Sequence, residues 1–380
     1  MRIGIDIVTL SQARQKTGLF YYIDHLTRQL QDDADHRCTL YCARGDGSWA
    51  RKTFTGRRVR SLRPPPRFYR VWRAMAAFNR SDVYLHNLLS DIGPITRGAN
   101  VYCVPDVIPL AISGGVPASD IGFYRAYYDE AVRNSSDIIC WAEHAKRDLL
   151  AKVGGDPERV HVVPLAAGPE FSPVGQAELP GRLAGTGLAP GSYVLGVASI
   201  ETRKNYPVLL RAFARLLARD GRLPHRLALA GAKGYGHKAV FDEAARLGLS
   251  DRVIHLGYAA DLPALYSGAA AFAFPSRYEG FGLPPLEAMA CGTPVVCSDA
   301  TSLPEVVGDA ALLFDPDDEI ALADHLHRLL TDPLARADYA ARALVRSGRF
   351  SWGQTAAGYL RVMNAAHARW AGRPTEAATA

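Results

Sequence analysis

The stretch RYEGFGLPPLEAMACGTPVVCSD at residues 277–299 decides the fold of the second half of the chain. It directly follows the apolar run AAAFAFPS, which predicts a buried strand. Its glycines predict a tight loop, Pro284 and Pro285 suit the first positions of a helix, and Gly292 suits the helix end. The run TPVVCSD predicts a further strand. Strands that alternate with helices in this way indicate a parallel sheet.

Two carboxylates flank the loop in this stretch, Glu279 ahead of it and Glu287 in the expected helix. Taken singly, Glu279 is a solvated loop residue and Glu287, expected in the first helical turn, is an acid stabilised by the helix dipole. Gly280 and Gly282 change that interpretation, because the free N–H groups of such a loop can receive an anion such as a diphosphate. We expect the two carboxylates to accept hydrogen bonds from sugar hydroxyls beside that anion.

A second motif, ETRKN at residues 201–205, lies between a predicted strand and the start of a predicted helix. Cations at a helix start oppose the macrodipole, so structure alone does not favour Arg203 and Lys204 at this place. An anionic ligand between them and the Glu279 loop would offset that unfavourable term. A pair of surface cations is the alternative if the motif is considered alone.

Strands and helices alternate in both halves of the chain, which predicts two doubly wound parallel sheets. The length of 380 residues also exceeds what one hydrophobic core usually supports. We expect a first domain at residues 1–172, a Gly- and Pro-rich linker at 173–192 and a second domain at 193–352. Residues 353–380 are expected to form a C-terminal helix, packed back on the first domain, and a tail. Ligands of such sheets bind at the carboxyl ends of the strands.

The composition, 48% hydrophobic and 22% charged, is typical of a soluble globular protein. No apolar run reaches the ~18 residues that span a bilayer, and the start MRIGIDIVTL lacks the features of a secretory signal. These patterns favour a cytoplasmic protein. Six scattered cysteines without zinc spacing predict reduced core thiols. We expect Asp315, Asp317 and Asp318 to form a polar turn and a helix cap rather than a metal site.

Residues 51–80 contain ten Lys and Arg and no Asp or Glu. Of the 44 basic residues, 34 therefore remain against 38 acidic ones elsewhere, so the net charge of +6 belongs to this segment. Arginines interleaved with aromatics suggest nucleic acid, while an amphipathic helix over residues 68–80 suggests an anionic membrane surface. A solvated loop is the third alternative. We favour the membrane surface and expect no nucleic acid partner.

Residues 193–352 resemble the retaining GT-B glycosyltransferases of family 4 (group 1), most closely their mannosyltransferase-like branch. The resemblance is carried by an ordered series of motifs: ETRKN, LAGAKGYG, HLGYAADLPALYSGA, PSRYEGFGLPPLEAMACGTPVVCSD, SLPEVVGDAALLFDPDD and FSW. The first half matches more loosely, through RIGIDIVTL, TGLFYY, EHAKRDL and VVPLAAGPEFSP. The resemblance implies an α/β fold of the GT-B type, with two Rossmann-like doubly wound domains that face a cleft.

The resemblance also implies roles for individual residues. Glu279 would contact the hydroxyls of the donor sugar, Glu287 the ribose, and Lys204 the diphosphate. Arg203 would replace the arginine that many relatives carry at the position of Ser199. The remaining donor-binding positions would be Gly18, Gly280, Phe281, Gly282 and Leu283.

The first half departs from the family pattern at three places. Phe20 stands where the second glycine of the first loop would fall, Pro105 replaces a histidine before Asp106, and Ala142 replaces a serine. Asp106 and His144 are candidates on the acceptor side, although each also fits a hydrogen-bonding role at the edge of the core.

The implied reaction transfers a hexosyl group, with mannose favoured, from a nucleotide diphosphate sugar, GDP-mannose first. The acceptor would be a saccharide or a polyprenyl-diphosphate-linked saccharide of cell-surface polysaccharide synthesis, used at the inner face of the cytoplasmic membrane. Because Arg203 and Lys204 would stabilise the leaving diphosphate, no metal or other cofactor is required. The donor phosphate itself can take the acceptor proton.

Two alternatives remain at this point. The changes at Phe20, Pro105 and Ala142 permit an inactive relative that only binds sugar nucleotides. A retaining glycoside hydrolase would need two carboxyls about 5 Å apart, one of them protonated. The neighbouring cations instead favour ionised forms of both Glu279 and Glu287.

Overall fold

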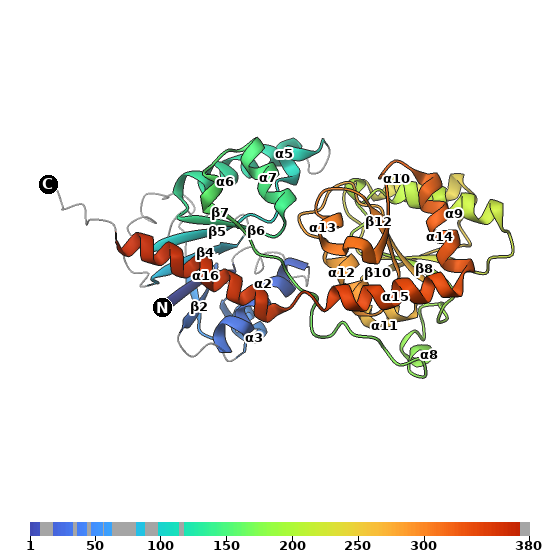
Figure 1. The fold of residues 1–380 in the computed structure, drawn as a ribbon, viewed down its shortest axis with the longest axis horizontal. Helices are drawn as coiled ribbons and strands as arrows, with labels where there is room; N and C mark the ends of the chain where they lie inside the picture. Colours follow the sequence, from blue (N-terminus) through green and yellow to red (C-terminus); the bar gives the residue numbers. More distant parts are fainter. Residues whose placement is uncertain are drawn as a thin grey trace. The chain divides into compact units, whose positions relative to one another are not determined.

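The computed structural model describes residues 1–7, 18–32, 36–43, 47–55, 57–62, 81–87, 98–113 and 118–372. The chain divides into two compact units (Figure 1). Unit 1 comprises Met1–Ala111, Ser119–Leu165 and Trp352–Ala380, and unit 2 comprises Ile112–Ala118 and Ala166–Ser351.

The described part of unit 1 is built on a parallel sheet in the order β3-β2-β1-β4-β5-β6-β7. Its strands are β1 (Arg2–Asp6), β2 (Arg37–Ala43), β3 (Val59–Leu62), β4 (Val83–Asn87), β5 (Ala99–Cys103), β6 (Asp137–Cys140) and β7 (Val160–Val162). Its helices are α2 (Gly18–Asp32), α3 (Gly47–Thr53), α5 (Ile108–Ala111), α6 (Ile121–Asn134), α7 (Glu143–Lys152) and α16 (Trp352–Ala371). Every residue of β4 and β5 is buried, as expected for central strands of a parallel sheet covered on both faces.

The C-terminal helix α16 belongs to unit 1. Its fully buried Tyr359 hydroxyl lies 2.8 Å from the Tyr22 hydroxyl of α2 and accepts a hydrogen bond from Trp141 Nε1 at 3.0 Å. Further along the helix, the Arg369 guanidinium pairs with the buried carboxylate of Asp137 at the start of β6. The helix therefore adds buried hydrogen bonds and an ion pair to unit 1.

Unit 2 is built on a parallel sheet in the order β10-β9-β8-β11-β12-β13. Its strands are β8 (Tyr193–Val197), β9 (Arg226–Ala230), β10 (Val253–Gly257), β11 (Ala271–Phe274), β12 (Val295–Ser298) and β13 (Ala311–Phe314). Its helices are α8 (Leu179–Arg182), η4 (Thr202–Lys204), α9 (Tyr206–Arg219), α10 (His237–Arg246), α11 (Leu262–Gly268), α12 (Leu283–Ala290), α13 (Leu303–Val307), η5 (Gly308–Ala310), α14 (Glu319–Thr331) and α15 (Pro333–Ser347). The two sheets confirm the predicted doubly wound α/β class.

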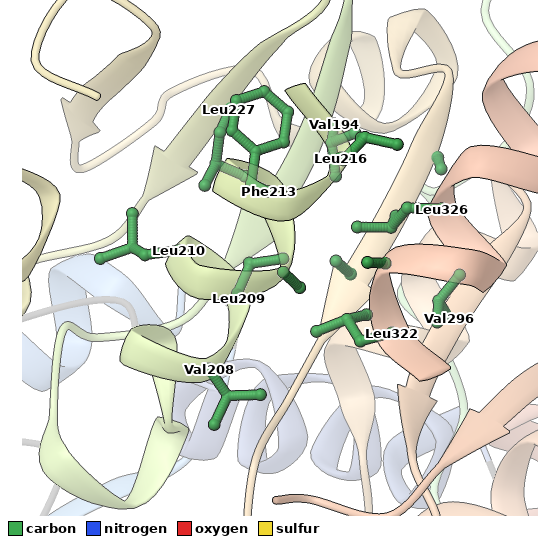
Figure 2. Packing of buried hydrophobic residues seen from close by; sticks show 14 of the residues in the cluster. Val194, Val208, Leu209, Leu210, Phe213, Leu216, Leu227, Val296, Leu322 and Leu326 are labelled. Atoms are coloured by element: carbon green, nitrogen blue, oxygen red, sulfur yellow. The ribbon is translucent and has the colours of Figure 1, made fainter. Parts of the chain in front are cut away.

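The core of unit 2 lies where α9 and α14 cover the sheet, as Figure 2 shows. Leu209, Phe213 and Leu216 recur at helical spacing along α9 and are buried. They pack in one cluster with Leu322 and Leu326 of α14. This core supports the strands that end at the candidate site.

The segment at residues 173–192 differs from the linker expected there. Unit 2 already begins at Ala166, and within the segment Leu179, Leu183 and Leu188 are buried in the second core cluster of unit 2. Arg182 also pairs with Asp261 at 2.7 Å. The Gly and Pro residues serve as turns in a packed segment, which a composition signal alone does not distinguish from a hinge.

The end of α3 and the strand β3 fall within the basic segment at residues 51–80. The sequence pattern predicts no helix or strand for this part of the segment. Within it Arg57 is nearly buried, pairs with Asp24 at 2.9 Å and lies over the ring of Phe54. Residues 63–80, and with them the expected amphipathic helix at 68–80, lie outside the described residues. Among the helices that the structure describes, none is long and apolar enough to cross a membrane.

Candidate active site

The candidate site lies at the carboxyl ends of β8 and β11, which are neighbours in the middle of the unit 2 sheet. The strand order reverses between these two strands, and such a switch point is where open α/β sheets bind ligands. The η4 turn follows β8, and the Glu279 loop follows β11. A backbone hydrogen bond of 2.9 Å from Arg277 N–H to the Arg203 carbonyl fastens the two segments together.

The two motifs singled out in the sequence meet in one buried cluster. Lys204 Nζ lies 2.5 Å from Glu279 Oε1, and Arg203 Nη1 lies 3.2 Å from Glu279 Oε2. Lys204 is 7% and Glu279 8% exposed. The ammonium of Lys204 also stacks on the ring of Phe274 at 5.1 Å. A buried cation and a buried carboxylate are therefore held together with the partly exposed Arg203.

The protonation of this cluster follows from burial and charge. Burial raises the pKa of Glu279, but the charges of Lys204 and Arg203 outweigh it and bring the pKa below its usual value. For Lys204, burial lowers the pKa and the Glu279 charge raises it, and the net shift is downward. The Glu279 carboxylate is thus an ionised acceptor, as the sequence interpretation required.

Glu201 is a site residue that the sequence reasoning missed. Its Oε2 lies 3.4 Å from Arg203 Nε, and its Oε1 accepts a hydrogen bond from Ser199 at 2.7 Å. The Glu201 carboxylate therefore pairs with Nε of Arg203, while Glu279 pairs with its Nη1. The only signal in the sequence was its place two residues ahead of Arg203, which by itself favours no particular role.

The loop after Glu279 leaves backbone donors available. Gly282 has φ +122°, and a Cβ added there would lie 2.9 Å from Leu303 Cδ2, so the position requires glycine. Among the described residues, the N–H groups of Gly280, Phe281, Gly282 and Leu283 find no acceptor. The first three of these residues are buried. Unpaired N–H groups at a helix start can receive an anion.

The structure corrects two expectations about Glu287. The helix α12 begins at Leu283, so Glu287 lies in its second turn rather than its first. Burial raises the pKa of Glu287 to about 7, although Tyr266 donates a hydrogen bond of 2.9 Å to Oε2 and acts in the opposite direction. Glu287 is therefore not a second permanently ionised carboxylate, because burial outweighs the hydrogen bond from Tyr266.

Comparison with known proteins identifies the domain that carries this site. Residues 189–345 match the family model of the glycosyl transferases group 1. Unit 2 carries a group 1 glycosyltransferase domain.

Curated relatives extend the match beyond the group 1 domain. The O-antigen chain mannosyltransferase B of Escherichia coli is 35% identical over 238 residues, 62% of this chain and 62% of the relative. The serotype-specific mannosyltransferase WbdA of Escherichia coli is 34% identical over 283 residues, which are 73% of this chain and 34% of the relative. The matches thus span less than two thirds of either relative's length.

Solved structures share the fold over nearly the whole chain. Anabaena HepE in complex with UDP and glucose superposes with a TM-score of 0.79 at 20% identity, covering 96% of this chain and all of the other. Sucrose-phosphate synthase from Thermosynechococcus elongatus gives 0.75 at 20% identity, covering 97% of this chain and all of the other. At these identities the likeness establishes the GT-B fold and nothing further.

Three of the predicted site residues belong to unit 1 and lie outside the matched range 189–345. Gly18 is the exposed first residue of α2. Asp106 Oδ1 accepts a hydrogen bond from Ile108 N–H at 3.0 Å, at the start of α5. His144 Nε2 lies 3.4 Å from Asp148 Oδ2, one turn along α7. Asp106 and His144 follow the neighbouring strands β5 and β6, so both stand at the carboxyl edge of that sheet.

The remaining sequence expectations concern acidic and thiol groups. Asp318 accepts hydrogen bonds from Ile320 and Ala321 at the start of α14, and Asp315 accepts from Asp317 N–H, which confirms a polar turn and a helix cap. All six cysteines fall in the described part of the chain, where they are buried thiols outside any disulfide, as predicted. A surface hollow near Gly191, Gly268 and Gly292 lies at the opposite edge of the unit 2 sheet, away from Glu279.

Proposed function

We propose that the protein is a retaining glycosyltransferase of family 4 that moves a hexosyl group, with mannose favoured, from a nucleotide diphosphate sugar to a hydroxyl of a saccharide or polyprenyl-diphosphate-linked saccharide. The observation that carries the proposal is the cluster of Arg203, Lys204 and Glu279 beside four consecutive N–H groups that find no acceptor in the described part of the chain. A donor diphosphate and its sugar supply what that arrangement lacks: an anion for the donors and hydroxyls for the carboxylate.

In this reaction the cations act on the leaving group. Negative charge grows on the diphosphate as the bond to the sugar breaks, and buried, preorganised cations stabilise such charge far better than water does. Arg203 and Lys204 supply this stabilisation without a metal ion. Glu279, held ionised by the same cations, accepts hydrogen bonds from the sugar hydroxyls. The donor phosphate takes the proton of the acceptor hydroxyl on the same face.

Glu287 serves the nucleotide end of the donor. Ribose hydroxyls donate hydrogen bonds, and a bond to the ionised carboxylate favours its charged form. Because the pKa of free Glu287 is about 7, donor binding and ionisation of Glu287 are coupled near neutral pH. Gly280, Phe281, Gly282 and Leu283 meet the diphosphate through their backbone N–H groups.

The choice of mannose and of GDP-mannose is supported by the relatives named mannosyltransferases. The fold neighbour bound to UDP and glucose requires that uridine donors be tried beside it. A panel of GDP-mannose, UDP-glucose and related donors with purified protein, with and without saccharide acceptors, tests the proposal. Release of nucleoside diphosphate is expected with one donor, and Glu279→Ala or Lys204→Ala abolishes it.

The same panel separates the alternatives. Binding of a donor without turnover in any combination favours the inactive sugar-nucleotide-binding relative. A glycoside hydrolase cleaves a model glycoside without any nucleotide. The raised pKa of Glu287 suits an acid catalyst, but both oxygens of Glu279 are already engaged by cations, which leaves no free carboxylate nucleophile in the pair.

The proposal extends to the location of the reaction. A lipid-linked acceptor places it at the inner face of the cytoplasmic membrane, with the basic segment at residues 51–80 on anionic lipid. Flotation with phosphatidylglycerol vesicles tests this, using Arg58, Arg60, Arg63, Arg67 and Arg70 changed to Gln. Arg57 is left intact, because it pairs with Asp24 inside unit 1. Unchanged flotation of the variant contradicts the lipid contact.

A further inference from the structure

Two hydroxyl side chains fasten the loop that carries Glu279. The Glu279 N–H donates to Thr301 Oγ1 at 3.0 Å. Ser302 Oγ lies 2.9 Å from the Glu279 carbonyl oxygen and 2.7 Å from that of Phe281, so its single O–H is shared between these two acceptors. Thr301 and Ser302 follow β12, the strand beside β11. The backbone of Glu279 is thus held on both its N–H and its C=O side by one corner of the chain.

Ser302 is placed as a helix cap but is used differently. It occupies the N-cap position of α13, where serine ordinarily accepts a hydrogen bond from an N–H group of its own helix. Its hydroxyl makes no such bond. With no exposed surface, the side chain directs its donor to the loop carbonyls instead. Ser302 therefore bonds to the Glu279 loop instead of capping its own helix.

Thr301 keeps an unfavourable backbone conformation at this corner. Its φ is +54°, which β-branched residues rarely adopt and which stores on the order of 1–3 kcal/mol. The other non-glycine residue with positive φ in the described chain is Asn205, a type that tolerates the conformation. Glycine at 301 would remove the strain, but it would also remove the hydroxyl that binds Glu279 N–H.

The corner also limits where the loop can go. Leu303, the first residue of α13, lies against Gly282 so closely that a Cβ there would be 2.9 Å away. The carbonyls of Glu279 and Phe281 face the Ser302 hydroxyl, while the N–H groups from Gly280 to Leu283 are left without acceptors in the described structure. The fastening therefore selects which backbone groups of the loop remain for a ligand.

We propose that Thr301 and Ser302 are positioning residues that fix Glu279 against Lys204 and Arg203 and present the loop donors to the sugar end of the donor. The ligand part of this inference rests on the proposed function. Neither residue touches the reacting atoms; each acts through the Glu279 backbone. Strain at Thr301 is retained because its hydroxyl fixes that backbone. Loss of the hydroxyl is expected to weaken recognition of the sugar more than recognition of the nucleotide.

The first experiment does not depend on the function. Amide hydrogen exchange of residues 277–283 is compared in the free wild-type protein, Thr301→Val, Thr301→Ser and Ser302→Ala. Thr301→Val should speed exchange at Glu279 about fivefold or more, because one hydrogen bond is lost, while Thr301→Ser restores the wild-type rate. Thr355→Val, which removes a buried hydroxyl bond to Pro164 in unit 1, is the matched control and should leave residues 277–283 unchanged. If the Glu279 amide exchanges at the same rate in Thr301→Val and in the wild type, the inference that Thr301 fastens the loop is overturned.

The second experiment measures sugar recognition. Affinities for GDP-mannose and GDP, and in parallel for UDP-glucose and UDP, are determined for the same proteins and for Thr301→Gly. The affinity ratio of nucleotide sugar to nucleoside diphosphate should fall about fivefold in Thr301→Val and Thr301→Gly and persist in Thr301→Ser. Thr301→Gly should nevertheless melt no lower than Thr301→Val, since its backbone strain is relieved.

The two failures are distinguishable. If Thr301→Val exchanges faster but the wild-type protein binds none of the four nucleotides, the proposed function fails and the fastening stands. If the wild type binds donors and Thr301→Val and Thr301→Gly keep its affinity ratio, the positioning role is overturned while the proposed function stands.

Discussion

Lys204 Nζ and Glu279 Oε1 lie 2.5 Å apart in the core of the candidate site, although 75 residues separate the two positions in sequence. The pair forms because β8 and β11 are neighbours in the sheet and each is followed directly by its motif. Together with Arg203 and Glu201 the pair forms a cluster of two cations and two carboxylates. The two cations are the groups that a diphosphate would pair with.

Breaking this pair should destabilise unit 2 more than breaking an exposed pair. Lys204→Met leaves the Glu279 carboxylate with one cation, and removing one partner of a buried pair costs about 3–5 kcal/mol. The double variant Lys204→Met/Glu279→Gln should be less destabilised than the sum of the single changes. Urea unfolding measures both. As the matched control, Arg219→Met removes an ion pair with Asp324 that is more than half exposed, and it should change stability by less than about 1 kcal/mol.

Glu287 should make the stability of the free protein depend on pH. The carboxyl ionises near pH 4.5 in the unfolded chain but near 7 in the folded one, so the unfolded state holds fewer protons between these values. Stability therefore falls as pH rises from about 4.5 to 7, by up to about 3 kcal/mol. Glu287→Gln should be more stable than wild type at pH 8 and equal to it below pH 4.5, as thermal melts at both pH values would show.

The same substitution should weaken nucleotide binding, because the neutral amide is a poorer acceptor than the carboxylate. In wild type the affinity for GDP should increase as pH rises through 7, while the affinity of Glu287→Gln should not. Titration calorimetry at pH 6 and 8 checks the difference. Parallel pH profiles for the two proteins would contradict a contact between Glu287 and the nucleotide.

Gly282→Ala tests the geometry of the loop. Its φ of +122° is unfavourable for alanine by at least about 1–2 kcal/mol, and the new Cβ would also press on Leu303. Both effects should lower the melting temperature and donor affinity together. Gly181→Ala is the control, since a Cβ at that helical position meets nothing within 4 Å and should be neutral or slightly stabilising.

Tyr359→Phe tests the attachment of α16 to unit 1. The change removes the acceptor of the half-buried Trp141 indole N–H and a partner of the buried Tyr22 hydroxyl. Unsatisfied buried groups cost about 1–3 kcal/mol each, although Tyr22 retains Asn87 at 2.9 Å. Hydrogen exchange should therefore rise in β5 and β6 while the protection of β8 and β11 is kept. A uniform rise in both units would contradict the assignment of α16 to unit 1.

Much of the candidate site was predictable from local patterns. Gly282 and the two prolines indicated a loop and a helix start, and cations placed against a helix dipole indicated an anion at Arg203 and Lys204. Glu201 and the pair Thr301 and Ser302 were not predictable in the same way. A serine near a helix start predicts a cap. No local pattern indicates that its hydroxyl bonds to a loop more than 20 residues earlier in the chain.

Burial was the other quantity that local patterns misjudged. Glu287 was expected to be ionised, but its surroundings raise its pKa to about 7. The Gly- and Pro-rich segment at residues 173–192 was expected to be a linker, but its leucines pack into unit 2. In both cases the deciding contacts come from other parts of the chain, which bury the Glu287 carboxyl and pack Leu183 into the cluster that contains Tyr193.

The sequence by itself determined the alternation of strands and helices, the doubly wound class of both sheets, and the residue types at the loops after β8 and β11, because periodicity, glycine and proline act within a few residues. Only the tertiary structure decided that Lys204 meets Glu279, that Thr301 and Ser302 fasten the Glu279 loop, and that Glu287 holds its proton near neutral pH. Those properties depend on strand order and burial, which arise from contacts between residues far apart in the chain.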